Sequence, residues 1–151
     1  MARQGFSSSI LLPWCARLIL GAIFIYAAID KILHPEAFAK AVFNYQILPH
    51  DFINATAIVL PWLELVLGIF LVFGLFREGS VGLVTLLLLV FLGAMAFNLS
   101  RGLNIDCGCF SSGSGSSGVH MGWYVLRDSL FLVPALYLFY ITFRRRNRRY
   151  A

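Results

Sequence analysis

The sequence has few charged residues for its length. Only 13% of its 151 residues are Asp, Glu, Lys or Arg, whereas a water-soluble domain carries about 25%. Because 60% of the residues are apolar, this scarcity excludes a soluble enzyme and a disordered tail. Three cysteines are too few for a secreted miniprotein held together by disulfides. The mean hydropathy of +0.81 indicates a small integral membrane protein instead.

Four long apolar stretches account for most of this hydropathy. They cover residues 10–33, 55–76, 81–99 and 123–143, and each approaches or exceeds the roughly 20 residues that a spanning helix needs. The first stretch is longer than the 7–15-residue core of a signal peptide, so we interpret it as a helix. The sequence therefore predicts an all-α integral membrane protein, in which residues 1–151 form a single four-helix transmembrane bundle.

The basic residues are distributed unevenly along this bundle. Eight of the twelve Lys and Arg residues fall on the side that holds both chain ends, including an arginine run at 144–149. Cytoplasmic flanks carry such an excess, so we expect both termini in the cytoplasm and the protein in a bacterial inner membrane. A basic run beside an apolar segment is typical of contact with the lipid bilayer, and no nucleic-acid partner is expected.

Two longer connections are predicted on the outer side. The first, residues 34–54, has apolar residues at helical spacing between Pro35 and Pro49, which predicts a short amphipathic helix between the first two spans. The second, residues 100–120, contains Cys107-Gly108-Cys109 followed by a serine–glycine run. We expect this second connection to be a redox loop.

The Cys107–Cys109 pair is suited to a labile disulfide. A disulfide requires Cα atoms about 4.4–6.8 Å apart, and two cysteines separated by one glycine can reach this range. Such a small ring is strained and exposed, which makes the bond comparatively easy to reduce. Three alternatives stay open: two unrelated thiols, half of a metal site, or a lipid anchor. A zinc or iron–sulfur site needs about four ligands, whereas two thiolates suffice for copper(I), and no metal ligands are assigned here.

Charged residues inside the spans form a second group of candidates. Glu64 falls near the middle of the second span, where an unpaired charge costs about 2.5–3.5 kcal/mol, and we expect Arg127 or Arg17 as its partner. Arg127-Asp128 adds a doublet of opposite charges near the outer surface. These charges either clamp the helices together or serve the cysteines. In the second case Lys31, Arg101 or Arg127 stabilises a thiolate, while Glu64 handles protons.

Two further residues are interpreted on weaker grounds. Pro61 precedes Trp62 in the second span, and a loosened helix there would leave room for a planar group such as a quinone ring. Trp62 and Arg17 are the residues expected to bind it. Packing and interfacial anchoring are the alternative roles for this dipeptide. Cys15 lies among apolar residues of the first span, so we interpret it as a small packing residue.

Several of these segments together resemble the MauE branch of the DoxX-like membrane proteins. The matching segments are Arg17 to Lys31, Pro61 to Gly68, and the stretch Asn98 to Phe110, NLSRGLNIDCGCF. The resemblance implies a four-helix bundle that takes part in disulfide formation or reduction beside a thioredoxin-like partner, as in methylamine dehydrogenase maturation. It also implies that Cys107 and Cys109 are the redox pair and that four charged residues form a polar framework: Arg17, Lys31, Glu64 and Arg101.

Two functions follow as hypotheses. In the first, the protein is a membrane thiol–disulfide oxidoreductase or electron relay that exchanges disulfides with a periplasmic thioredoxin-like protein and passes electrons to or from a quinone. The quinone is inferred from location, because a pair on the outer face has no direct access to cytoplasmic nicotinamides. In the second, it is a non-catalytic assembly factor or subunit of a periplasmic or membrane oxidoreductase.

Overall fold

The computed structural model describes residues 5–102 and 121–150, which fold entirely as helices and turns. Five helices occur in this part of the chain: α1 (Gly5–Leu33), α2 (Pro35–Asn44), α3 (His50–Phe73), α4 (Arg77–Ser100) and α5 (Met121–Tyr150). All but α2 contain a segment long and apolar enough to cross a membrane. The prediction of an all-α membrane protein with four spanning helices and a short helix between the first two is confirmed.

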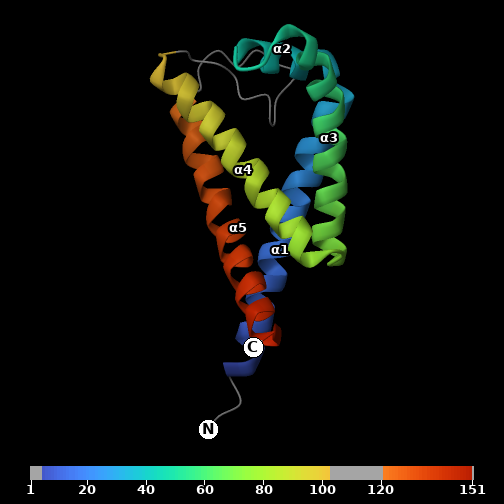
Figure 1. Ribbon diagram of the computed structural model, residues 1–151, viewed down its shortest axis with the longest axis vertical. Coiled ribbons are helices and arrows are strands. Elements are labelled where there is room, and N and C mark those ends of the chain that lie inside the picture. The colour runs from blue at the N-terminus through green and yellow to red at the C-terminus, as the bar shows by residue number, and fades with distance from the viewer. Residues whose placement is uncertain (1–4, 103–120, 151) are drawn as a thin grey trace.

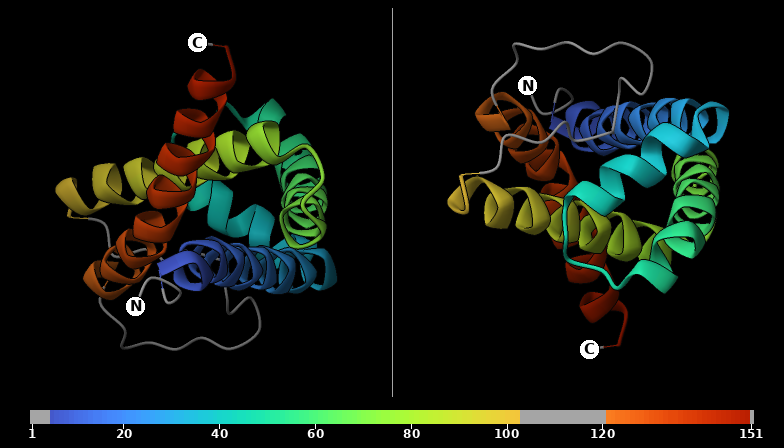
Figure 2. Two further views of the ribbon diagram at one scale, coloured as in Figure 1. Left: turned by 90° about the horizontal axis from the view of Figure 1, so that it is seen from below. Right: turned by 90° about the horizontal axis from the view of Figure 1, so that it is seen from above.

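The four long helices are arranged as two antiparallel pairs. Helix α1 lies beside α3, and α4 lies beside α5 (Figure 1). The pairs converge near the turn between α3 and α4 and separate toward the other end, where α2 lies across the bundle (Figure 2). We refer to these as the turn end and the α2 end. The separation at the α2 end creates space for the polar groups described below.

Small residues bring α1 and α3 into close contact. A Cβ atom added at Gly68 would lie 3.0 Å from the carbonyl oxygen of Gly21, and one added at Gly21 would lie 3.0 Å from the carbonyl oxygen of Gly68. Helices in lipid associate through such close packing, because lipid already solvates apolar side chains. A core of buried side chains joins all four long helices: Ala16, Leu20, Phe24, Leu67, Leu71, Val81, Val84, Leu88, Ala135 and Leu138.

The turn between α3 and α4 differs from the sequence prediction. The apolar stretches 55–76 and 81–99 predict a connection at residues 77–80, but Arg77, Glu78 and Gly79 form the first turn of α4. The chain reverses earlier, at Gly74 and Phe76, which take left-handed φ values of 74° and 43°. Glycine at the end of a helix adopts this conformation without steric cost, and Glu78 is favourable near the positive end of the α4 dipole.

Helix α2 and the connection after it cover the α2 end. Pro35 stands at the first position of the helix, where its missing N–H is not needed. Phe38 and Ala41 are buried, so the helix has the apolar face that the spacing predicts. A left-handed residue, Gln46, follows it with φ of 50° and turns the chain back into α3.

Candidate functional site

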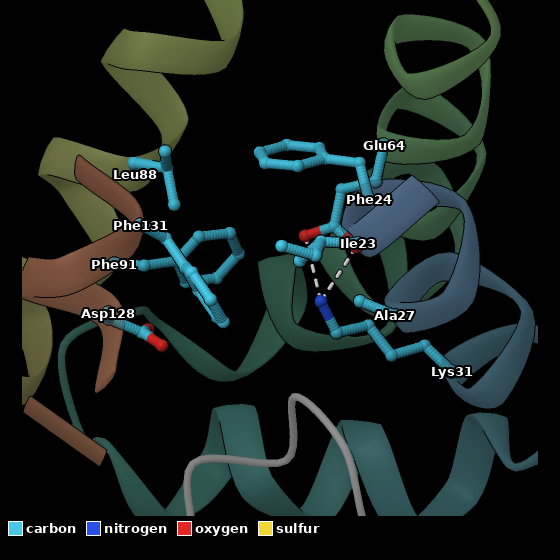
Figure 3. A pocket seen from close by; sticks show the side chains of 9 residues that line it. All are labelled: Ile23, Phe24, Ala27, Lys31, Glu64, Leu88, Phe91, Asp128 and Phe131. Atoms are coloured by element: carbon cyan, nitrogen blue, oxygen red, sulfur yellow. Dashed lines mark hydrogen bonds and ion pairs between the residues drawn. The ribbon is translucent and has the colours of Figure 1, made fainter. Parts of the chain in front are cut away.

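A buried ion pair joins α1 to α3 in the half of the bundle nearer α2. The Lys31 ammonium nitrogen Nζ lies 2.7 Å from Glu64 Oε1 and 2.6 Å from Oε2 (Figure 3). The two side chains are 1% and 3% exposed. A charge buried in a membrane bundle must be compensated, and here each residue compensates the other. The prediction that Arg127 or Arg17 pairs with Glu64 is therefore wrong.

The antiparallel arrangement of α1 and α3 explains this pairing. Counted from the Gly21–Gly68 contact, Lys31 is ten residues away and Glu64 is four, which at 1.5 Å per residue is a depth difference of about 9 Å. The Cα–Cβ bonds of a helix tilt toward its N-terminus. In antiparallel helices Lys31 therefore leans toward the bundle centre and Glu64 toward the α2 end, and the two long side chains meet.

Two aromatic rings enclose the ammonium group. The Lys31 Nζ atom lies 5.1 Å from the ring centre of Phe38 in α2 and 5.1 Å from that of Phe91 in α4. Rings at this distance attract a cation through their negative faces. Lys31 is thus held by three helices besides its own, although the sequence places it near the end of a span.

A small cavity lies beside the ion pair, between the two helix pairs. Its volume is about 40 Å³, and its polar lining comes from Lys31, Glu64 and Asp128, with apolar side chains completing it (Figure 3). A water molecule needs about 10–15 Å³ of such volume, so the cavity is large enough for water. It is much smaller than the 150 Å³ cavity that accepts a benzene ring, so no quinone ring fits beside the pair.

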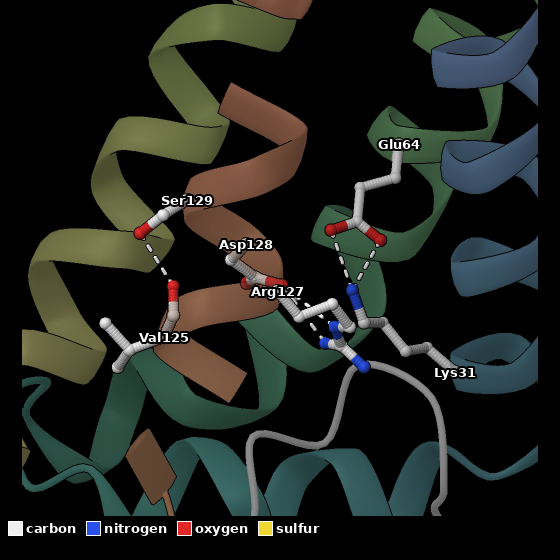
Figure 4. A network of polar contacts seen from close by, with 6 residues as sticks. All are labelled: Lys31, Glu64, Val125, Arg127, Asp128 and Ser129. Carbon is white, nitrogen blue, oxygen red and sulfur yellow. Dashed lines mark hydrogen bonds and ion pairs between the residues drawn. The ribbon is translucent and has the colours of Figure 1, made fainter. Parts of the chain in front are cut away.

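A second ion pair faces this cavity from α5. Arg127 donates hydrogen bonds to Asp128 Oδ1 from Nε at 3.2 Å and from Nη2 at 3.1 Å (Figure 4). Asp128 is buried and Arg127 is partly buried. The attraction predicted for this neighbouring pair is present. The small cavity thus has Lys31 and Glu64 on the side of α1 and α3 and the Asp128 carboxylate on the side of α5.

Arg17, Trp62 and Arg101 lie outside this cluster. Arg17 is toward the turn end, where its Nη2 donates a hydrogen bond to the Leu71 carbonyl oxygen at 3.1 Å and so satisfies a terminal acceptor of α3. The Trp62 side chain is 55% exposed on α3. Arg101 is exposed after α4, where its Nη2 donates to Gln46 Oε1 at 3.4 Å.

The cysteines fall into two groups. Cys107 and Cys109 lie outside the described residues, so the predicted redox pair and the loop at 100–120 stay predictions beyond Gly102. Cys15 is exposed on α1, so it does not pack inside the bundle formed by the described residues. No cluster of three or more His, Cys, Asp or Glu residues suited to a metal occurs in the described part of the chain.

Sequence reasoning missed one buried polar residue near the end of α4. The Asn98 side chain is fully buried, and its Nδ2 donates a hydrogen bond to the Ala94 carbonyl oxygen at 3.0 Å. Its Oδ1 has no hydrogen-bond partner among the described residues. The side-chain amide of Asn98 within an otherwise apolar run could have indicated its burial, since polar side chains in membrane spans face the bundle interior.

Comparison with known proteins identifies the family. The profile described as methylamine utilisation protein MauE matches residues 9–141. The methylamine utilization protein MauE of Paracoccus denitrificans is 38% identical over 101 residues, which is 66% of this chain and 54% of that protein. The MauE of Methylophilus methylotrophus is 33% identical over 124 residues, 82% of this chain and 65% of that protein.

A more distant relative has a different name. Protein TlpB of Flavobacterium psychrophilum is 28% identical over 141 residues, which is 86% of this chain and 37% of that protein. No solved structure matches this chain. The chain spans about half to two thirds of the length of the MauE relatives it matches. With most of its residues covered by the family profile, the chain belongs to the MauE family of membrane proteins.

Proposed function

We propose that this protein is a membrane thiol–disulfide oxidoreductase that relays electrons between a thioredoxin-like protein and a membrane quinone. The observation that carries the proposal is the sequence Cys107-Gly108-Cys109. The C-terminal end of α4 and the N-terminal end of α5, which flank it in the sequence, lie toward the α2 end (Figure 1). The buried Lys31–Glu64 pair and the Asp128 carboxylate lie in the half of the bundle nearer that end.

The exchange reaction balances as follows. A thiolate of the partner attacks one sulfur of an oxidised Cys107–Cys109 pair, the sulfur–sulfur bond breaks, and a mixed disulfide forms. The second thiolate of the partner then displaces the cysteine, so that the partner leaves oxidised and this protein holds two thiols. A membrane quinone takes two electrons and two protons from these thiols and becomes a quinol. A strained disulfide between near neighbours favours the first step.

The charged residues have separate roles in this proposal. Arg101, six residues before Cys107, favours the thiolate form of the pair by its positive charge. The cluster of Lys31, Glu64 and Asp128 around the polar cavity holds the protons that accompany two-electron transfer. Arg127 fixes Asp128 in place. Arg17 and the Gly21–Gly68 contact serve the fold alone.

The biological setting is inferred from the names of the relatives. Several relatives are named methylamine utilization proteins. We infer that this protein supports the maturation of a periplasmic redox enzyme, with the cysteine pair on the periplasmic side of a bacterial inner membrane and both termini in the cytoplasm. The excess of basic residues on the side of the chain ends supports this orientation.

Trapping a mixed disulfide tests the proposal directly. In a Cys109→Ser or Cys107→Ser variant the remaining thiol can still attack the disulfide of an oxidised partner, but no neighbouring thiol is left to complete the exchange. Only the partner's own second thiolate can then reverse the attack, so acid quenching of intact membranes followed by thiol alkylation should capture the covalent complex. Mass spectrometry after non-reducing electrophoresis would identify the partner. A Cys15→Ser variant is the control and should trap nothing. If neither variant forms a mixed disulfide, the exchange reaction is refuted.

Membranes that contain a variant without either cysteine distinguish this proposal from a non-catalytic assembly role. A double Cys107→Ser/Cys109→Ser variant should lose the maturation activity while it still inserts in the membrane. If the double variant co-purifies with the same redox enzyme and supports its full activity, the cysteines are dispensable. The protein would then be a non-catalytic assembly factor or subunit.

A further inference from the structure

A second cavity, larger and lined almost entirely by apolar atoms, shares the Phe91 side chain with the cavity beside the ion pair. Its volume is about 190 Å³, and it is enclosed by α2, the connection after α2, α3 and α4. Its lining includes Phe38, Tyr45, Thr56, Val90, Phe91 and Ala94. The Lys31–Glu64 pair does not line this cavity, but Phe91 lines both.

The size of the cavity matches a single ring. A cavity of 150 Å³ lined by apolar side chains binds benzene, so about 190 Å³ accommodates a six-membered ring with small substituents. Complete ligands occupy sites of about 300–1,000 Å³. The rest of a long ligand would therefore have to lie outside the cavity.

The cavity is placed where such a ligand could enter from the membrane. Val90 is 59% exposed on α4, and Ile47 and Leu48 after α2 are 48% and 40% exposed. These side chains line the cavity and are also accessible from outside. An isoprenoid tail could extend from the ring past these apolar residues into lipid.

The lining favours a planar, largely apolar ring over a plain hydrocarbon chain. Phe38, Tyr45 and Phe91 provide aromatic surfaces, on which a planar ring can stack. Thr56 also carries a hydroxyl group, which can donate one hydrogen bond to a ring carbonyl oxygen. A lipid acyl chain would use neither feature.

The charge behind the aromatic wall complements a quinone that gains electrons. Lys31 Nζ is 5.1 Å from the ring centres of both Phe38 and Phe91, and both rings line the cavity. The positive end of the Lys31–Glu64 pair thus lies against the cavity wall. A positive charge in a medium of low dielectric stabilises the negative charge that develops on quinone oxygens during reduction.

We propose that the cavity between α2, α3 and α4 binds the ring of a membrane quinone. This inference rests on the proposed function for the direction of electron flow: the quinone gains two electrons and two protons, and a dithiol is oxidised to a disulfide. The binding itself needs no cysteine, which allows it to be tested separately.

The test measures binding of decylubiquinone to the full chain purified in detergent micelles, by isothermal titration calorimetry. Ala94→Phe fills the cavity and should weaken binding at least tenfold. Ala96→Phe places the same side chain at an exposed position of α4 and should leave binding unchanged. Thr56→Val should weaken binding by a smaller factor while it keeps the shape of the cavity. The Cys107→Ser/Cys109→Ser variant should bind as tightly as wild type.

Competition with 1-decanol distinguishes a ring site from an acyl-chain site. Decanol shares the decyl tail with the quinone but has no ring, so a large excess should displace little quinone. If decanol displaces the quinone at equal concentration, or if Ala94→Phe and Ala96→Phe bind alike, the assignment is overturned. A failure here together with a trapped mixed disulfide would refute the quinone site while the proposed exchange reaction stands.

Discussion

Lys31 and Glu64 lie on antiparallel helices, and the Lys31 ammonium nitrogen contacts both carboxylate oxygens of Glu64 at 2.6 and 2.7 Å. The pair is almost completely buried. A buried charge whose partner is removed is strongly destabilising, whereas replacing both charges with apolar groups of similar volume is often neutral. The coupling between these residues is therefore measurable as a non-additive effect on stability.

Single substitutions of this pair should be more harmful than the double one. Glu64→Leu or Lys31→Met alone should lower the free energy of unfolding in micelles by about 3–5 kcal/mol, because each leaves a buried charge. The variant that carries both changes should recover most of that loss. Thermal unfolding of the four proteins gives the coupling energy. Strictly additive losses would mean that the two charges do not interact.

The close contact of α1 and α3 should be sensitive to one methyl group. Gly68→Ala should destabilise the bundle by about 1–3 kcal/mol, because the new Cβ would lie 3.0 Å from the Gly21 carbonyl oxygen and 2.8 Å from Ile25 Cγ1. Gly93→Ala is the matched control in α4, since nothing lies within 4 Å of its added Cβ. The control should be neutral or stabilising by up to about 1 kcal/mol. Equal unfolding temperatures for the two variants would contradict the contact.

The reversal between α3 and α4 should depend on glycine at one position. Gly74 has φ of 74°, and a Cβ there would lie 2.5 Å from Arg17 Nη2. Gly74→Ala should cost about 1–2 kcal/mol from the left-handed conformation alone. Gly79→Ala, in the first turn of α4 with open space around it, should cost nothing. Circular dichroism melts would compare them, and a loss confined to Gly79→Ala would place the turn where the sequence suggested.

The proposed orientation predicts which side of the membrane exposes the cysteine pair. In a Cys15→Ser background, a reduced Cys107–Cys109 pair should react with a membrane-impermeant maleimide in intact spheroplasts. Reaction should be weak in inverted vesicles until detergent is added. The mass increase of the purified protein measures the labelling. Preferential labelling in inverted vesicles would place the pair in the cytoplasm and remove the periplasmic exchange partner.

Much of the fold could be predicted from hydropathy, because every apolar run must satisfy its backbone hydrogen bonds within the membrane. The helix between Pro35 and Pro49 was also predictable from the spacing of its apolar residues. The contacts that this helix makes through Phe38 could not be predicted from the sequence. The Phe38 ring contacts the Lys31 ammonium group and also lines the larger cavity. Both contacts depend on how α2 lies across the bundle.

The sequence by itself determined that the chain crosses a membrane, that Glu64 requires a compensating charge, and that Arg127 and Asp128 attract each other as neighbours. Only the tertiary structure decided that Lys31 is the partner of Glu64. Burial and the need for a counter-charge are properties of single residues, so a sequence reveals them. The choice among several cations depends on which helices are adjacent, in which direction their side chains lean, and how deep each residue lies, and packing alone sets these.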